Sequence, residues 1–140
     1  LAVSYGQHSV QCGTVLKPSD ARKQPTVNWP SDSQKLYTLM MVDPDAPSRK
    51  RPTMGQWLHW LVVNVPGSSI DQGQTLTPYA PPTPPSGSGL HRYVFLAYQQ
   101  SAQLNANSVS QRPKFSAKQF ASNNGLGAPV AGNFFQTESR

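Results

Sequence analysis

The sequence is poor in acidic residues, with six aspartates and glutamates against twelve lysines and arginines in 140 residues. Hard metal ions such as Ca²⁺ need several carboxylate oxygens, so this chain has few ligands to offer a calcium or magnesium site. The net charge of +6 favours anionic partners such as phosphate-bearing lipids, phosphoproteins or nucleic acid. A surface with spare lysines and no such partner is the alternative.

Cysteine is nearly absent from the chain. Cys12 is the only one, which excludes an intramolecular disulfide and a cysteine-based zinc site and predicts a buried or half-buried thiol. The sequence also contains no N-x-[ST] glycosylation sequon with an allowed middle residue. Both absences favour a cytoplasmic location and leave secretion or an organelle as alternatives.

Long apolar runs are missing as well. No run approaches the roughly 18 residues that a membrane span needs, and the N-terminal LAVSYGQHSV lacks the apolar core of a signal peptide. The length suits one hydrophobic core rather than two. We therefore expect residues 1–140 to form a single soluble domain.

Proline and glycine punctuate the chain, with fourteen and ten copies, which favours an all-β domain with long loops. Three segments are rich in β-branched and aromatic residues and nearly continuously apolar, as expected of central strands covered on both faces. They are Leu36–Val42, Trp60–Val65 and Arg92–Gln99. Leu1–Tyr5 and Val10–Val15 are predicted to pair as an N-terminal hairpin.

Two connections and one helix complete the expected organisation. The connection 66–89 is too rich in proline and glycine to be helical, and the polar connection 101–113 is expected to be the most mobile segment. A helix is predicted after Ser116, an N-cap that forms a capping box with Gln119. Gly125 stands where a glycine would end that helix.

Two of the six acidic residues stand together in the step Asp43-Pro44-Asp45. An aspartic-protease dyad takes its carboxylates from two separate loops, so two aspartates in one turn have the wrong geometry for it. Too few other carboxylates are available for a hard-metal site. The residues alone favour a proline turn in which the aspartates cap backbone N–H groups.

Two of the three histidines stand in equivalent places. His59 follows a leucine at the start of one predicted strand, and His91 does the same at another. A single histidine among apolar residues is most often part of the core, whereas two at the entrances of neighbouring strands favour a shared site. His8 has no such setting and is expected at the surface.

The loop 84–89, Pro-Pro-Ser-Gly-Ser-Gly, leads into His91. Its glycines would let backbone N–H groups approach an anion, and an ordinary surface loop is the alternative. Ser86 and Ser88 are not in a G-x-S-x-G elbow, so neither is expected to be a nucleophile. The basic run Arg49–Arg51 could steer anions or form a solvated turn. The chain contains no DNA- or RNA-reading motif.

Three blocks of the sequence together resemble the phosphatidylethanolamine-binding protein family, which includes kinase-inhibitor proteins of animals and flowering regulators of plants. The blocks are DPDAPSR (43–49), GQWLHWLVVNVPG (55–67) and PPSGSGLHRYVFLAYQQ (84–100), with a weaker match at 114–136. The resemblance implies a mainly β fold, a β-sandwich with a large central antiparallel sheet, few short helices and a cis-proline turn at Ala46–Pro47. Relative to typical members, an N-terminal segment and a C-terminal helix are expected to be either absent from the protein or outside residues 1–140.

The resemblance also implies a small surface cavity that binds phosphate, phosphorylethanolamine or a similar anion. The phosphate would accept hydrogen bonds from His59, His91 and the Tyr93 hydroxyl, and from backbone N–H groups of residues 83–89. The aspartates would hold the histidine rings, keep them positively charged and receive a ligand ammonium. The lining residues would be Asp43, Asp45, Ala46, Trp57, His59, Pro84, Pro85, Gly87, His91 and Tyr93.

We therefore expect a non-enzymatic module that binds a phosphatidylethanolamine headgroup or another phosphate-bearing group and modulates or inhibits a kinase or a protease. No catalytic residue, metal or cofactor is expected. The alternative is a structural domain within a larger assembly that contains nucleic acid, which the basic composition suits. Outside such an assembly we expect a monomer, with peripheral membrane contact through the headgroup.

Overall fold

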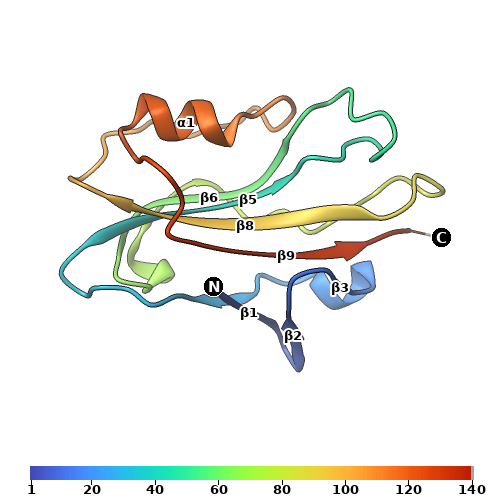
Figure 1. The fold of residues 1–140 in the computed structure, drawn as a ribbon, viewed down its shortest axis with the longest axis horizontal. Helices are drawn as coiled ribbons and strands as arrows, with labels where there is room; N and C mark the ends of the chain where they lie inside the picture. The colour runs from blue at the N-terminus through green and yellow to red at the C-terminus, as the bar shows by residue number, and fades with distance from the viewer. Residues whose placement is uncertain (140) are drawn as a thin grey trace.

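The computed structural model describes residues 1–139 as two β-sheets and one α-helix stacked in layers (Figure 1). The smaller sheet has three strands in the order β2 (His8–Val10), β1 (Ala2–Tyr5) and β4 (Thr26–Asn28). The larger has six, in the order β3 (Thr14–Val15), β9 (Ala131–Thr137), β8 (His91–Gln100), β5 (Leu36–Asp43), β6 (Trp57–Pro66) and β7 (Gln74–Thr77). Two 3₁₀ turns, η1 (Pro18–Ala21) and η2 (Ile70–Gln72), lie in the connections.

The large sheet is covered on both faces, as its apolar strands predict. Strand β5 lies at its centre between β6 and β8, and every residue of β5 after Leu36 is buried. On one face Leu39 and Met41 pack in the core that the smaller sheet completes. On the other, Met40 and Val42 belong to the core beneath α1 (Ala117–Asn123). The mainly β, two-sheet architecture confirms the expected fold class.

The pairing differs from the prediction at two places near the N-terminus. The hairpin joins β1 to β2, which ends at Val10, so the predicted strand Val10–Val15 is wrong. Thr14–Val15 instead belongs to the larger sheet, where it pairs with β9 in parallel. The large sheet is therefore mixed rather than wholly antiparallel. Gly13, at a φ of +87°, makes the turn that redirects the chain.

The connection 66–89 is not helical, but it contains the strand β7 and the short turn η2, which the sequence did not predict. The connection 101–113 has neither helix nor strand. Helix α1 begins after Ser116, whose hydroxyl oxygen accepts from the backbone N–H of Gln119. The Gln119 side chain donates to Asn123 rather than closing the predicted capping box.

Cys12 is exposed, so the expectation of a buried thiol is wrong. The residue lies in the turn between β2 and β3, where the chain passes from one sheet to the other at the protein surface. His8 is exposed, as expected, and lies 3.4 Å from Asp20.

Candidate functional site

The large sheet brings together three strand ends that are far apart in the sequence. Because β5 runs antiparallel to both neighbours, its last residue lies beside the first residues of β6 and β8. Asp43 is opposite Trp57, and Val42 is opposite Val94. Alternation along a strand then places His91 and Tyr93 on one face of β8.

His59 is placed by a β-bulge. Met41 pairs with Trp60 and Val42 with Leu58, so His59 is the extra residue between them. Bulges redirect side chains at the ends of sheets and beside functional sites. The His59 ring meets the Tyr93 ring edge-on, with 5.2 Å between the ring centroids.

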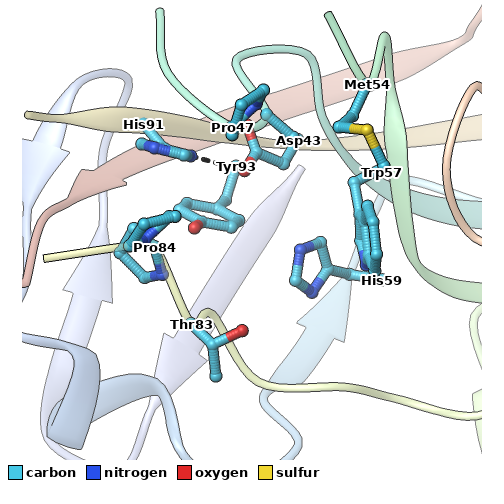
Figure 2. A pocket seen from close by; sticks show the side chains of 11 residues that line it. Asp43, Pro47, Met54, Trp57, His59, Thr83, Pro84, His91 and Tyr93 are labelled. Atoms are coloured by element: carbon cyan, nitrogen blue, oxygen red, sulfur yellow. Dashed lines mark hydrogen bonds and ion pairs between the residues drawn. The ribbon is translucent and has the colours of Figure 1, made fainter. Parts of the chain in front are cut away.

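These strand ends surround a cavity of about 180 Å³. Figure 2 shows His59 and Trp57 on one side of it, His91 and Pro84 on the other, and Tyr93 between them. The Ala46–Pro47 peptide bond in its wall is cis. The lining residues are Asp43, Ala46, Pro47, Met54, Trp57, His59, Thr83, Pro84, Pro85, His91 and Tyr93.

The strongest polar contact of the cavity joins His91 to Asp43. His91 Nδ1 lies 2.7 Å from Asp43 Oδ2, and both side chains are at most 4% exposed. The other carboxylate oxygen, Oδ1, accepts from the backbone N–H of Asp45 at 2.8 Å. A carboxylate can only accept, so His91 Nδ1 carries the proton of the 2.7 Å contact.

The second nitrogen of His91 faces the loop before β8. His91 Nε2 lies 2.9 Å from the Ser88 hydroxyl oxygen, and that hydroxyl donates to the Pro85 carbonyl at 2.6 Å. A serine hydroxyl has one proton to donate. Since the Pro85 carbonyl accepts that proton, the Ser88 oxygen faces His91 Nε2 as an acceptor.

The other histidine has a different environment. His59 Nδ1 donates to the Ala80 carbonyl at 2.8 Å, which leaves Nε2 as the ring nitrogen available to a ligand. Burial lowers the pKa of His59 below its ordinary value of 6.5, and the nearby Arg112 guanidinium lowers it further. His59 is therefore neutral at pH 7. The expectation that the two aspartates hold both rings and keep both charged is wrong for His59.

Asp45 does not line the cavity, because its carboxylate is turned to Arg92. Arg92 donates from Nη2 to Oδ1 at 2.7 Å, and from Nε and its backbone N–H to Oδ2 at 2.9 and 2.8 Å. Burial acts to raise the pKa of Asp45, but the bonds and charge of Arg92 outweigh it and the pKa is lowered. Asp45 thus fixes the turn after β5 and does not touch a histidine ring through any of these bonds.

Tyr93 lies at the base of the cavity within a row of rings. It stacks on Phe135 at 5.3 Å and lies nearly parallel to the His91 ring at 6.2 Å. Burial raises the pKa of Tyr93, and the negative charge of Asp43 raises it further. Its hydroxyl therefore stays protonated at neutral pH, and because it also hydrogen-bonds Asp43, a ligand would compete with Asp43 for its proton.

Eight of the ten residues expected at the site surround the cavity, and Asp45 and Gly87 do not. The Gly87 N–H donates to the Ser139 carbonyl at 3.3 Å, and the Ser88 N–H donates to Pro85, so these two groups are not free for an anion. The sequence also missed Met54, which carries no pattern of its own. Backbone bonds to Ala46 and Lys114 place it at the rim.

Ser88, His91 and Asp43 share the connectivity of a serine–histidine–aspartate relay. Three observations argue against a nucleophile here. The Ser88 proton is held by Pro85 rather than by the histidine, Ser88 does not line the cavity, and its backbone N–H is also taken by Pro85. The arrangement can bind and orient a ligand but lacks a prepared nucleophile.

Other features contribute nothing further at the cavity. The run Arg49–Arg51 does not line it, and Lys50 and Arg51 are exposed. Among residues 1–139, no three histidine, cysteine, aspartate or glutamate side chains group as metal ligands. Within the same residues, no helix has the length and apolar character needed to cross a membrane.

Comparison with known proteins agrees with this geometry. The family model described as "Phosphatidylethanolamine-binding protein" matches residues 5–135. The chain belongs to this family. A crystal structure of carboxypeptidase Y inhibitor complexed with the cognate proteinase superposes with a TM-score of 0.86 at 29% identity, covering 99% of this chain and 82% of that chain.

Two curated relatives extend the phosphatidylethanolamine-binding protein comparison. A "26 kDa secreted antigen" of Toxocara canis is 44% identical over 137 residues, covering 93% of this chain and 52% of the relative. A protein named "Putative odorant-binding protein A5" of Drosophila melanogaster is 39% identical over 135 residues, covering 91% of this chain and 64% of the relative. The chain thus spans about half to two thirds of these relatives' length.

Family membership and these relatives fit a role in binding or inhibition. The first relative is named as secreted, so the cytoplasmic location expected from the sequence stays a prediction.

Proposed function

We propose that the cavity binds a phosphate-bearing ligand of headgroup size, such as phosphorylethanolamine, and that the protein is a non-enzymatic binding module. The observation that carries this proposal is the convergence of His59, His91 and Tyr93 on a cavity of about 180 Å³. Sites for drug-sized molecules usually have volumes of roughly 300–1,000 Å³. This cavity therefore suits one headgroup and excludes acyl chains.

The wall offers a separate place for each part of such a ligand. His91 contributes a positive charge that Asp43 partly offsets, and the hydroxyls of Tyr93 and Thr83 are donors at the same cavity. We assign the ligand ammonium to the face of Trp57, where a cation–π contact is available.

Anion binding is linked to protonation of His59. The pKa of this ring is lowered in the empty protein, and a bound anion favours its charged form. Affinity for sulfate, which does not titrate near neutral pH, should therefore rise as the pH falls from 7.5 to 5.5. His59→Gln should abolish this dependence, which calorimetry can measure; an unchanged pH dependence in the variant would contradict the linkage.

Imidazole NMR signals provide the main test. Inorganic phosphate and phosphorylethanolamine should both shift the His59 and His91 signals at millimolar concentration, and ethanolamine alone should not. His8 is the control within the same molecule, because it is exposed and does not line the cavity. Signals of His59 and His91 that stay unmoved, or that move no more than His8, would reject the binding proposal.

The non-enzymatic assignment has its own test. A fluorophosphonate probe, which labels activated serines, should leave the protein unlabelled because the Ser88 proton is held by the Pro85 carbonyl. Labelling that disappears in Ser88→Ala would show a working nucleophile and overturn the assignment.

The similarity to carboxypeptidase Y inhibitor supports a peptidase as the modulated partner. We expect the protein to lower carboxypeptidase Y activity in a purified assay, and an unchanged rate with the protein in large excess would reject that partner. Kinase, membrane and assembly partners stay predictions of the sequence.

A further inference from the structure

The loop between β7 and β8 contacts the cavity in two ways. Thr83, Pro84 and Pro85 form part of its wall, and Ser88 reaches the His91 ring from behind that wall. Pro85 to Ser88 form a β-turn: the Ser88 N–H donates to the Pro85 carbonyl at 3.0 Å, and Gly87 at φ +81° occupies the position that type II turns require. The turn thus fixes the place of the Ser88 hydroxyl.

The distances among Pro85, Ser88, His91 and Asp43 indicate which atom holds each proton. The Pro85 carbonyl can only accept, so the Ser88 hydroxyl donates its one proton in the 2.6 Å contact. The Ser88 oxygen is then an acceptor at 2.9 Å from His91 Nε2. Asp43 accepts from the opposite side of the ring at 2.7 Å. His91 is therefore held between two acceptors and has no donor facing either nitrogen.

We propose that Ser88 is a positioning residue of the binding site, which keeps His91 doubly protonated and positively charged by accepting a hydrogen bond from its Nε2. Asp43 alone would be satisfied by a neutral ring with its proton on Nδ1. Ser88 adds the second acceptor that the charged ring needs, and it ties that ring to the wall residue Pro85. The role of this charge in attracting the ligand rests on the proposed function.

The test uses three variants of the intact protein. Ser88→Ala removes the acceptor, and Ser88→Thr keeps a hydroxyl at the same place. Ser86→Ala is the matched control, because Ser86 is an exposed serine of the same turn, and none of the contacts described above involves its side chain. Ser86 is exposed and Ser88 is half-buried, and circular dichroism checks that each variant is folded.

The first readout is the ¹⁵N NMR signature of His91 at pH 7 without any ligand. We expect both ring nitrogens to be protonated in the parent protein, in Ser88→Thr and in Ser86→Ala, and only Nδ1 in Ser88→Ala. A singly protonated His91 in the parent protein would overturn the proposal. So would a signature that Ser88→Ala leaves unchanged.

The second readout is the affinity for inorganic phosphate. One hydrogen bond contributes about 2- to 10-fold in an equilibrium, so Ser88→Ala should bind phosphate that much more weakly while Ser88→Thr and Ser86→Ala bind as the parent does. Equal affinity of Ser88→Ala and the parent would overturn the role of Ser88 in binding. If neither the parent protein nor any variant binds phosphate, the proposed function fails. The ¹⁵N signature of His91 without ligand still decides the role of Ser88.

Discussion

His59 and His91 lie near the starts of two strands of the same sheet and line the same cavity, yet their surroundings impose different charges. His91 lies between a carboxylate and a hydroxyl oxygen, both of which accept from it. His59 donates once, to the Ala80 carbonyl, and Arg112 donates to the carbonyl of His59 itself at 3.2 Å. One ring is thus held charged and the other neutral by groups that lie far away in the sequence.

This division gives the cavity a preformed ion pair and a responsive group. The His91–Asp43 pair is formed before a ligand arrives, so no ordering of those side chains is needed on binding. His59 gains a proton more readily when an anion enters, which couples binding to pH in the direction given above. A site with two charged histidines would lack this coupling.

The largest expected effect comes from Asp43→Asn, which removes the charged partner of His91. Breaking a buried pair typically costs about 3–5 kcal/mol of unfolding free energy, and we expect the lower end here because His91 can lose its proton. Urea denaturation at pH 7 measures it. Asp71→Asn is the control, since Asp71 is exposed in η2 and does not line the cavity. Equal effects of the two substitutions would mean that the His91–Asp43 pair contributes no stability.

A smaller effect is expected from Asp45→Asn. Hydrogen bonds to charged groups contribute about 1.5–3 kcal/mol each, and Arg92 is 39% exposed and can turn to water after the change. We therefore expect Asp45→Asn to lower the free energy of unfolding, measured by urea denaturation, by an amount in the lower part of that range. Because Asp45 contacts Arg92 and not the histidines, the His91 ring signature should be retained; its loss would show that the two aspartates act as one unit.

The lowered pKa of Asp45 also makes stability depend on acid. The folded protein binds this proton less readily than the unfolded chain, so the contribution is complete above the ordinary value of 3.8 and is lost as the pH falls below it. Asp45→Asn should flatten the stability profile in that range. A profile that stays equally steep would assign the acid sensitivity to another group.

The smallest effect concerns His59 alone. Its pKa is lowered in the folded protein, so the unfolded chain gains a proton first as the pH falls below 6.5 and the folded state loses stability. His59→Gln should remove this part of the dependence of the urea midpoint on pH, and His8→Gln should leave it in place. If His8→Gln removed this pH dependence and His59→Gln kept it, the titrating group would lie outside the cavity.

The central strands were predictable because their local composition indicates that they are buried. Leu36–Val42 and Arg92–Gln99 are apolar on both faces, and the structure extends each by one residue or more. Strand β7 was not predictable, since Gln74–Thr77 carries only one strongly apolar residue. It exists because the free edge of β6 offers backbone partners to it.

The cavity was predictable in its residues and not in its charges. The motif blocks placed Asp43, His59 and His91 together, and the sheet brings them to one cavity. The partners of these residues come from positions without any sequence signal, such as Ala80 and Ser88. A carbonyl or a single hydroxyl leaves no pattern, so the protonation of each ring follows only from the three-dimensional contacts.

One measurement tests the central claim most directly: the ¹⁵N NMR signature of both cavity histidines in the ligand-free protein at pH 7. The account predicts that His91 carries protons on both nitrogens and that His59 carries one, on Nδ1. Two rings with the same signature, whether both charged or both neutral, would contradict it.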